Sequence, residues 1–378
     1  MTTLDSKKRP RNAQNSTADD PGHWEDGKKR AKRPVEFELP ITGKRIVRNE
    51  QRSSTYFVHY ETEVKTIDDL IALDAFYMQG NVDKRKGSNI PFATIHRIIE
   101  PLKAIQQMVG LDDVKEQILS IVVFFLQQFE QGNKDMLHTV VYGGPGVGKT
   151  KFIGLLAELY AGLGVLPSNK VTVAKRADMV GQYLGQTAIK TRKLIDEAKG
   201  GVLLIDEAYS LGDREQRDSY SKECIDVINQ ALSEEKAELI CIIAGYKEDL
   251  EQRFFRSNPG LERRFPFRIN ITDYKAVQLR DIFVQIVRSH GWDVEDNAAP
   301  IELFEENREH FRFNGGDMET LFTKTKFLHS LRVFGGIGGE EKKRFTREDI
   351  EAGLAAFLDN DSVRERKQFK DLISHIYL

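Results

Sequence analysis

The sequence of 378 residues has little of what marks secreted or membrane proteins. It contains only two cysteines, Cys224 and Cys241, too few for a disulfide framework. Its strongest apolar run, residues 118–126, is far shorter than the roughly 18 residues that a membrane span needs. No apolar segment follows the first charged residues, so we expect no secretory signal peptide. We therefore expect a protein of the cytoplasm or nucleus, with no membrane partner.

The amino-terminal region is short of apolar residues and rich in positive charge. Residues 1–34 carry nine Lys or Arg against five Asp or Glu, although the whole chain has a formal charge of −2. Residues 1–54 show no sustained apolar period and predict a disordered basic tail, because they cannot bury enough surface to offset the entropy of ordering. Two basic clusters, Lys7–Arg11 and Lys28–Arg33, match the composition of nuclear-import signals. A solvated tail without a role stays open, and an arm that binds nucleic acid is less favoured.

The rest of the chain predicts three further units. Residues 55–107 contain two amphipathic helical patterns and predict a helical preface. In residues 108–269, short apolar strands alternate with longer helices, which predicts a doubly wound α/β domain with a parallel sheet covered on both faces. Residues 270–378 show mainly helical patterns and predict an all-helical lid with further carboxyl-terminal helices.

A glycine-rich segment follows a predicted strand and opens a predicted helix, which is the context of a P-loop. Glycines let the backbone wrap so that its N–H groups point at phosphate oxygens, and the helix N-terminus adds positive charge. In such a loop the lysine reaches the β- and γ-phosphates of ATP, and the following hydroxyl ligates Mg²⁺. The segment consists of Gly143, Gly144, Pro145, Gly146, Val147, Gly148, Lys149 and Thr150.

A second motif ends an apolar run, residues 201–205, with two acids, Asp206 and Glu207. Ligands of doubly wound sheets bind at the carboxyl ends of the strands, so both acids should lie near the phosphates. Asp206 would hold Mg²⁺, and Glu207 would orient and deprotonate the attacking water. A glycine turn that binds nothing could explain the first motif alone, but both motifs in this order predict an ATP-hydrolysing enzyme of the P-loop class.

The sequence resembles the AAA+ ATPases, in particular the group of stage V sporulation protein K and the red-type, CbbX-like Rubisco activases. Related proteins of large DNA viruses and some protists are similar as well. The resemblance covers residues 108–326, and the motifs that carry it are MVGLDDVKEQI, GGPGVGKT, DMVGQYLGQTAIKT, GGVLLIDEAYSL, IIAGYKEDLE and NPGLERRFPFRI. It implies a nucleotide-binding core, a helical lid and an oligomeric ring.

The resemblance also implies roles for residues outside the two phosphate motifs. Val109 and Gly110 match the segment that lines the adenine pocket. Arg264 matches the arginine finger that one subunit offers to the γ-phosphate of its neighbour, with Arg263 as the fallback. A finger of this kind implies a homo-oligomer, typically a hexamer. Without the family context, this arginine pair would read as solvated loop residues.

A second implied feature is the pore loop Tyr183, Leu184 and Gly185, in which an aromatic side chain grips an extended polypeptide. A tyrosine packed on the domain surface is the alternative interpretation. The sequence departs from many AAA+ proteins at two places: Tyr246 follows the fourth core strand where a polar residue such as Asn is common, and the lid has Gly316 or Glu319 where an arginine is expected.

Three functions follow as hypotheses. The leading one is a ring-forming remodelling ATPase that acts on an unknown protein client. The second is a nucleotide-dependent assembly switch or scaffold with low turnover, which the missing lid arginine favours. The third is a nucleic-acid motor or loader, against which stands the absence of interleaved basic and aromatic residues around the proposed pore loop.

Overall fold

The computed structural model describes residues 34–49, 57–129, 137–183, 185–212, 218–235, 238–334, 342–361 and 363–364. Both basic clusters of the predicted tail and the pore-loop residue Leu184 lie outside the described residues. No described helix is long and apolar enough to cross a membrane.

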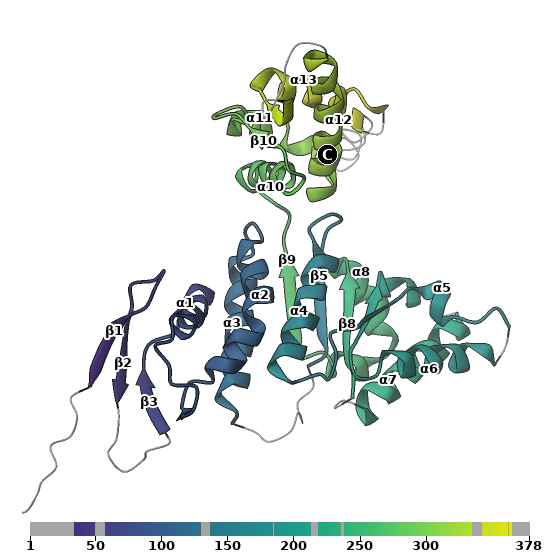
Figure 1. Ribbon diagram of the computed structural model, residues 1–378. Coiled ribbons are helices and arrows are strands. Elements are labelled where there is room, and N and C mark those ends of the chain that lie inside the picture. Colours follow the sequence, from purple (N-terminus) through teal and green to yellow (C-terminus); the bar gives the residue numbers. More distant parts are fainter. Residues whose placement is uncertain are drawn as a thin grey trace, which may run out of the picture.

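The central domain is a five-stranded parallel sheet with strand order β6-β7-β8-β5-β9 (Figure 1). Neighbouring residues of one strand alternate between its two faces. Val141 joins a buried cluster with residues of helices α2 (Phe92–Gln107), α3 (Asp112–Gln127) and α4 (Lys149–Leu163), whereas Val140 joins a second cluster with residues of α6 (Gln186–Ala198) and α7 (Ser219–Glu234). The strands are β5 Thr139–Gly143, β6 Val171–Ala174, β7 Val202–Asp206, β8 Ile240–Gly245 and β9 Phe267–Ile271. This arrangement confirms the predicted doubly wound α/β class.

Helices and short turns connect these strands. The longer helices are α3 Asp112–Gln127, α4 Lys149–Leu163, α6 Gln186–Ala198 and α7 Ser219–Glu234. The short elements are α5 Arg176–Met179, α8 Lys247–Asp249, α9 Pro259–Glu262, a 3₁₀ turn Ala208–Leu211 and a π-helical turn Leu250–Phe255. The turn from β5 into α4 follows the carboxyl end of a strand inside the sheet, between β8 and β9, and the carboxyl edge is where ligands of such folds bind.

A small α/β unit precedes the core, which corrects two predictions. Residues 34–49, which we predicted as part of a disordered tail, form a hairpin, and the preface predicted as helical contains strands. Its elements are β1 Val35–Glu38, β2 Arg45–Asn49, β3 Phe57–Glu61, β4 Gly87–Ser88, α1 Ile67–Met78 and α2 Phe92–Gln107. Ile46 is fully buried, and Phe37 packs edge-on against Phe76 of α1. The hairpin is therefore held by apolar partners far along the chain, which its own polar sequence does not reveal.

The carboxyl-terminal region forms the lid, and β9 leads directly into its first helix, α10 (Figure 1). The lid is mostly helical, as predicted, but two short parallel strands also join its parts. Its elements are α10 Ala276–Ser289, β10 Asp293–Val294, α11 Ile301–Glu306, a 3₁₀ turn Arg308–His310, α12 Gly315–Val333, β11 Arg344–Phe345 and α13 Arg347–Leu358.

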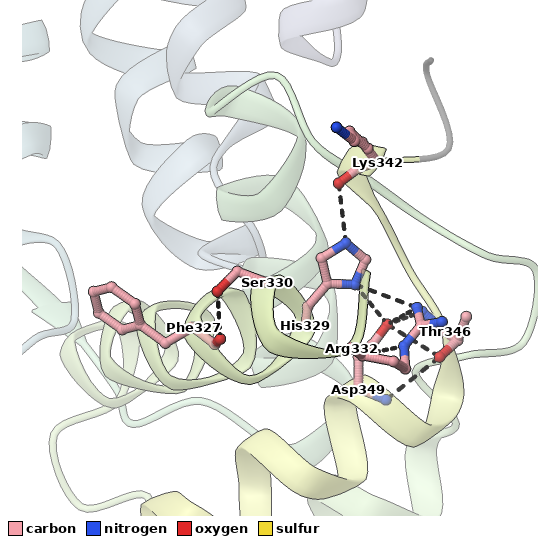
Figure 2. Close-up of polar contacts among 7 residues, drawn as sticks. All are labelled: Phe327, His329, Ser330, Arg332, Lys342, Thr346 and Asp349. Carbon is pink, nitrogen blue, oxygen red and sulfur yellow. Dashed lines mark hydrogen bonds and ion pairs between the residues drawn. The ribbon is translucent and has the colours of Figure 1, made fainter. Parts of the chain in front are cut away.

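A buried polar network ties α12 to α13 (Figure 2). Asp349 accepts hydrogen bonds from His329 and Arg332 of α12 and from Thr346, with which it forms the predicted capping box of α13. The other ring nitrogen of His329 faces the carbonyl of Lys342 at 3.0 Å. The network fixes how the two helices pack, so the lid has a defined shape to present to the core.

Candidate nucleotide-binding site

The predicted phosphate loop runs from the end of β5 at Gly143 to the start of α4 at Lys149. Gly146 and Gly148 have φ of 70° and 91°, in the left-handed region that favours glycine. The Lys149 ammonium curls back over the loop and donates to the carbonyls of Gly143 at 3.0 Å and Gly144 at 2.8 Å. Burial lowers the pKa of this lysine, so its charge is poorly hydrated and available to an anionic ligand.

The two acids lie at the end of β7. Asp206 is the last residue of the strand, and the next residue, Glu207, has φ of 54°, an uncommon conformation for a side-chain-bearing residue. Backbone strain of this kind concentrates at functional sites. Burial raises the pKa of Glu207, and the neighbouring Asp206 charge raises it further, while Lys149 opposes both. The acid pair and the loop lysine therefore form one electrostatically coupled group.

One cavity of about 490 Å³ joins these groups. Its lining includes Lys149, Thr150, Asp206 and Glu207 together with Val109 from the segment before α3. The other predicted residues that line it are Pro145, Gly146, Val147 and Gly148, whereas the predicted residues Gly110, Gly143 and Gly144 do not. The structure thus brings most of the predicted binding residues together from three separate segments.

The lid closes the other side of this cavity. Gly316 and Glu319, at the positions where an arginine is expected, both line it, so the lid presents a carboxylate there. Sequence reasoning missed Tyr274 and Ile286, which also line the cavity from the β9–α10 connection and from α10. Neither belongs to a local motif, so only the fold reveals them.

Tyr246 lies beside the phosphate loop. The Lys149 ammonium is 5.9 Å from the centre of its ring. Burial raises the pKa of Tyr246, the charge of Glu207 raises it further, and the charge of Arg312 opposes this. Arg312 is exposed and is not among the residues that line the cavity.

The remaining predicted residues that the structure describes do not line this cavity. Arg264 is half-buried and its Nε donates to the carbonyl of Asn229 at 3.1 Å, whereas Arg263 is exposed. The side chain of Tyr183 is 68% exposed. Gly185, with φ of 77°, caps the start of α6. Neither arginine reaches the nucleotide cavity of its own chain.

The glycine-rich loop at the end of a parallel strand, with an acid pair two strands away, defines a P-loop nucleoside triphosphatase. Residues 139–272 match the family model "ATPase family associated with various cellular activities (AAA)". A cfxQ-like protein of Acanthamoeba polyphaga mimivirus is 37% identical over 74% of this chain and 70% of its own length. Stage V sporulation protein K of Bacillus subtilis is 36% identical over 54% of this chain and 65% of its own length. The chloroplast ribulose bisphosphate carboxylase/oxygenase activase of Cyanidioschyzon merolae is 30% identical over 67% of this chain and 85% of its own length.

These relatives confirm the resemblance. The chain belongs to the AAA+ ATPases, in the group of cfxQ-like proteins, stage V sporulation protein K and Rubisco activase. It is a nucleotide-binding enzyme that hydrolyses ATP.

Proposed function

We propose that the protein is a ring-forming remodelling ATPase that uses ATP and Mg²⁺ to act on a protein partner. The observation that carries the proposal is the convergence of Lys149, Thr150, Asp206 and Glu207 on one cavity that the lid closes. Nucleotide bound there would touch core and lid at once, so its phosphates would bias their relative position.

The donor set fits a magnesium nucleotide. Thr150 supplies a hydroxyl and Asp206 a carboxylate, both hard oxygen donors, and Mg²⁺ commonly takes few protein ligands beside phosphate oxygens and water. Among the described residues, no cluster of three or more His, Cys, Asp or Glu could hold a metal. The ion would therefore depend on these two side chains and on the nucleotide, and it would neutralise phosphate charge.

Glu207 is the proposed general base. Its raised pKa, caused by burial and by Asp206, suits a group that accepts a proton from the attacking water. Lys149 would hold the phosphates and stabilise the charge that develops on them. Val109 would contact the adenine ring of the nucleotide, and Gly110, in the turn before α3, would help to form the adenine pocket.

Arg264 is the proposed arginine finger, which would act on the nucleotide bound by the neighbouring subunit. Such a finger requires an oligomer, and we favour a hexameric ring. The test mixes two inactive variants, Arg264→Ala and Glu207→Gln. A mixed ring contains intact sites that receive an intact finger from the neighbour, so mixing should restore ATPase activity. Arg263→Ala serves as the matched control and should retain activity. Mixtures as inactive as their components would contradict action in trans.

The proposed client is a protein, gripped by the exposed Tyr183 with Leu184 and Gly185. One relative is named an activase of an enzyme, which supports a protein as the client class but not Rubisco itself. The test is capture from native cells with Glu207→Gln, against Glu207→Gln combined with Tyr183→Ala. A protein retained by the first and lost by the second supports threading, and equal capture by both contradicts it.

A second candidate function is a low-turnover assembly switch. Glu319 lines the cavity at a position where many AAA+ lids supply an arginine, and this difference favours slow hydrolysis. A turnover far below about one per second, the low end for ordinary enzymes, together with nucleotide-dependent oligomers would support this second function. A nucleic-acid motor is the least favoured of the three functions. The basic clusters Lys7–Arg11 and Lys28–Arg33 favour import into the nucleus, and a cytoplasmic location is the alternative.

A further inference from the structure

A buried asparagine connects the lid to the phosphate loop. Asn314 lies directly before α12, and none of its surface is exposed. Its Nδ2 donates to the carbonyl of Pro145 at 3.2 Å and to Oδ1 of Asp273 at 2.9 Å, and its Oδ1 accepts from the backbone N–H of Tyr274 at 3.1 Å. One side chain thus links the loop, the β9–α10 connection and the lid.

The next two carbonyls of the loop are held from outside the loop as well. Gly146 accepts from the backbone N–H of Gly315, the first residue of α12, at 3.0 Å. Val147 accepts from the hydroxyl of Tyr274 at 2.8 Å, and this tyrosine is buried. Together with Pro145, three consecutive carbonyls of the phosphate loop accept hydrogen bonds from the lid and its connection.

Fixing these carbonyls also fixes the amides of the loop. A peptide group is planar and trans, so its N–H points opposite to its C=O. The three peptides concerned carry the N–H groups of Gly146, Val147 and Gly148, three residues that line the cavity. Such N–H groups are the ones with which a phosphate loop holds its anion. The lid contacts therefore set the direction of the groups that would bind phosphate.

The lid and the phosphate loop approach each other so closely that position 146 has no room for a side chain. A Cβ at Gly146 would lie 2.0 Å from the carbonyl oxygen of Phe313. Asn314 itself has φ of 46° and ψ of −117°, which a residue with a side chain rarely adopts. Strain of this kind persists where the surroundings hold it in place, as the buried hydrogen bonds do here.

We propose that Asn314 and Tyr274 are positioning residues that make the phosphate loop competent for nucleotide and couple its state to the lid. By linkage, a lid held in this position binds nucleotide more tightly, and bound nucleotide stabilises the lid position by the same factor. The inference rests on the nucleotide site proposed above and is independent of ring formation and of any client.

The test is ADP binding by isothermal titration calorimetry to the full chain and two variants. Asn314→Gly keeps the backbone conformation, since glycine adopts it without strain, and removes the side-chain bonds. Tyr274→Phe removes only the hydroxyl that Val147 accepts. We expect ADP affinity to fall about tenfold in Asn314→Gly and about fivefold in Tyr274→Phe, because each lost bond frees a loop carbonyl. The rise in melting temperature on adding ADP should shrink in parallel.

Asp349→Asn is the matched control, because it disturbs the lid network without touching the loop (Figure 2). It should lower the melting temperature and leave ADP affinity unchanged. Variants Asn314→Gly and Tyr274→Phe that bind ADP as tightly as the wild type would overturn the inference while the nucleotide site stands. A loss of affinity in Asp349→Asn equal to theirs would also overturn it, since any loosening of the lid would then suffice. A wild-type chain that binds no ADP would overturn the site and the inference together.

Discussion

Replacing Asp349 by asparagine should destabilise the lid by about 3 kcal/mol. The side chain of Asp349 is 2% exposed. It accepts from Nε and Nη2 of Arg332 and from Nδ1 of His329, each at 2.8 Å, and from the backbone of Thr346 at 2.9 Å. Asparagine has nearly the same size, but it turns one acceptor into a donor that faces these donors. The substitution therefore removes charge and hydrogen bonds with little change in packing.

The expected magnitude depends on how well water can replace the lost partner. Breaking a buried ion pair by removing one member typically costs about 3–5 kcal/mol. The side chain of Arg332 is 37% exposed, so water can solvate part of its charge once Asp349 is neutral. His329 is fully buried and has no such compensation. Because water can compensate one of the two donors and not the other, we take the low end of the range, about 3 kcal/mol.

Urea unfolding followed by tryptophan fluorescence measures this cost. Trp292 packs against the ring of His329 with 5.5 Å between ring centres, so its emission reports on the network. The chain has two tryptophans, and Trp24→Phe leaves Trp292 as the sole reporter. The control is Glu351→Gln, which removes an exposed pair with Arg347 and should leave the free energy of unfolding nearly unchanged, because water and salt screen exposed ion pairs. A change under about 1 kcal/mol in the Asp349 variant would refute the reasoning.

The same network predicts a pH dependence. Burial alone would raise the pKa of Asp349, but hydrogen bonds from Arg332 and His329 outweigh it and hold the pKa well below its ordinary value. The folded pKa is thus depressed below the unfolded value of about 3.9, so the stabilisation is complete well above that value and is lost as the pH falls through the folded pKa. The stability gap between wild type and Asp349→Asn should therefore narrow as the pH falls below about 4. A gap that widens on acidification contradicts this assignment.

Two further predictions concern the loop itself. Gly146→Ala should weaken ADP binding at least about tenfold, because the new Cβ would collide with the carbonyl oxygen of Phe313 and displace the lid. Isothermal titration calorimetry measures the affinity. An unchanged affinity would show that ADP binding does not depend on this contact with the lid. Thr150→Ala should raise the Mg²⁺ concentration needed for half-maximal ATPase activity by about tenfold, because one oxygen ligand is lost; an unchanged Mg²⁺ titration would remove Thr150 from the metal site.

The phosphate loop and the acid pair could be predicted because each is continuous in the sequence. Gly148, Lys149 and Thr150 are neighbours, and the strand that ends in Asp206 and Glu207 carries both acids with it. Their geometry follows from the local strand–loop–helix pattern. The sheet class followed for the same reason, since alternating strands and helices have few stable arrangements.

The lid side of the site could not be predicted, because its contacts join distant residues. Asn314 bonds to Pro145 across 169 positions, and Tyr274 to Val147 across 127. No local pattern distinguishes this asparagine from any other in a loop. The amino-terminal hairpin was missed for a similar reason, since Ile46 is buried only by the rest of its unit.

The most direct test of the account is ATP binding and steady-state hydrolysis by the wild type, Glu207→Gln and Lys149→Ala. We predict that the wild type hydrolyses ATP, that Glu207→Gln binds ATP with near wild-type affinity but turns it over at least about 100-fold more slowly, and that Lys149→Ala binds ATP poorly. Hydrolysis by Glu207→Gln at the wild-type rate, or unimpaired ATP binding by Lys149→Ala, would contradict the assignment of this cavity as the site of ATP hydrolysis.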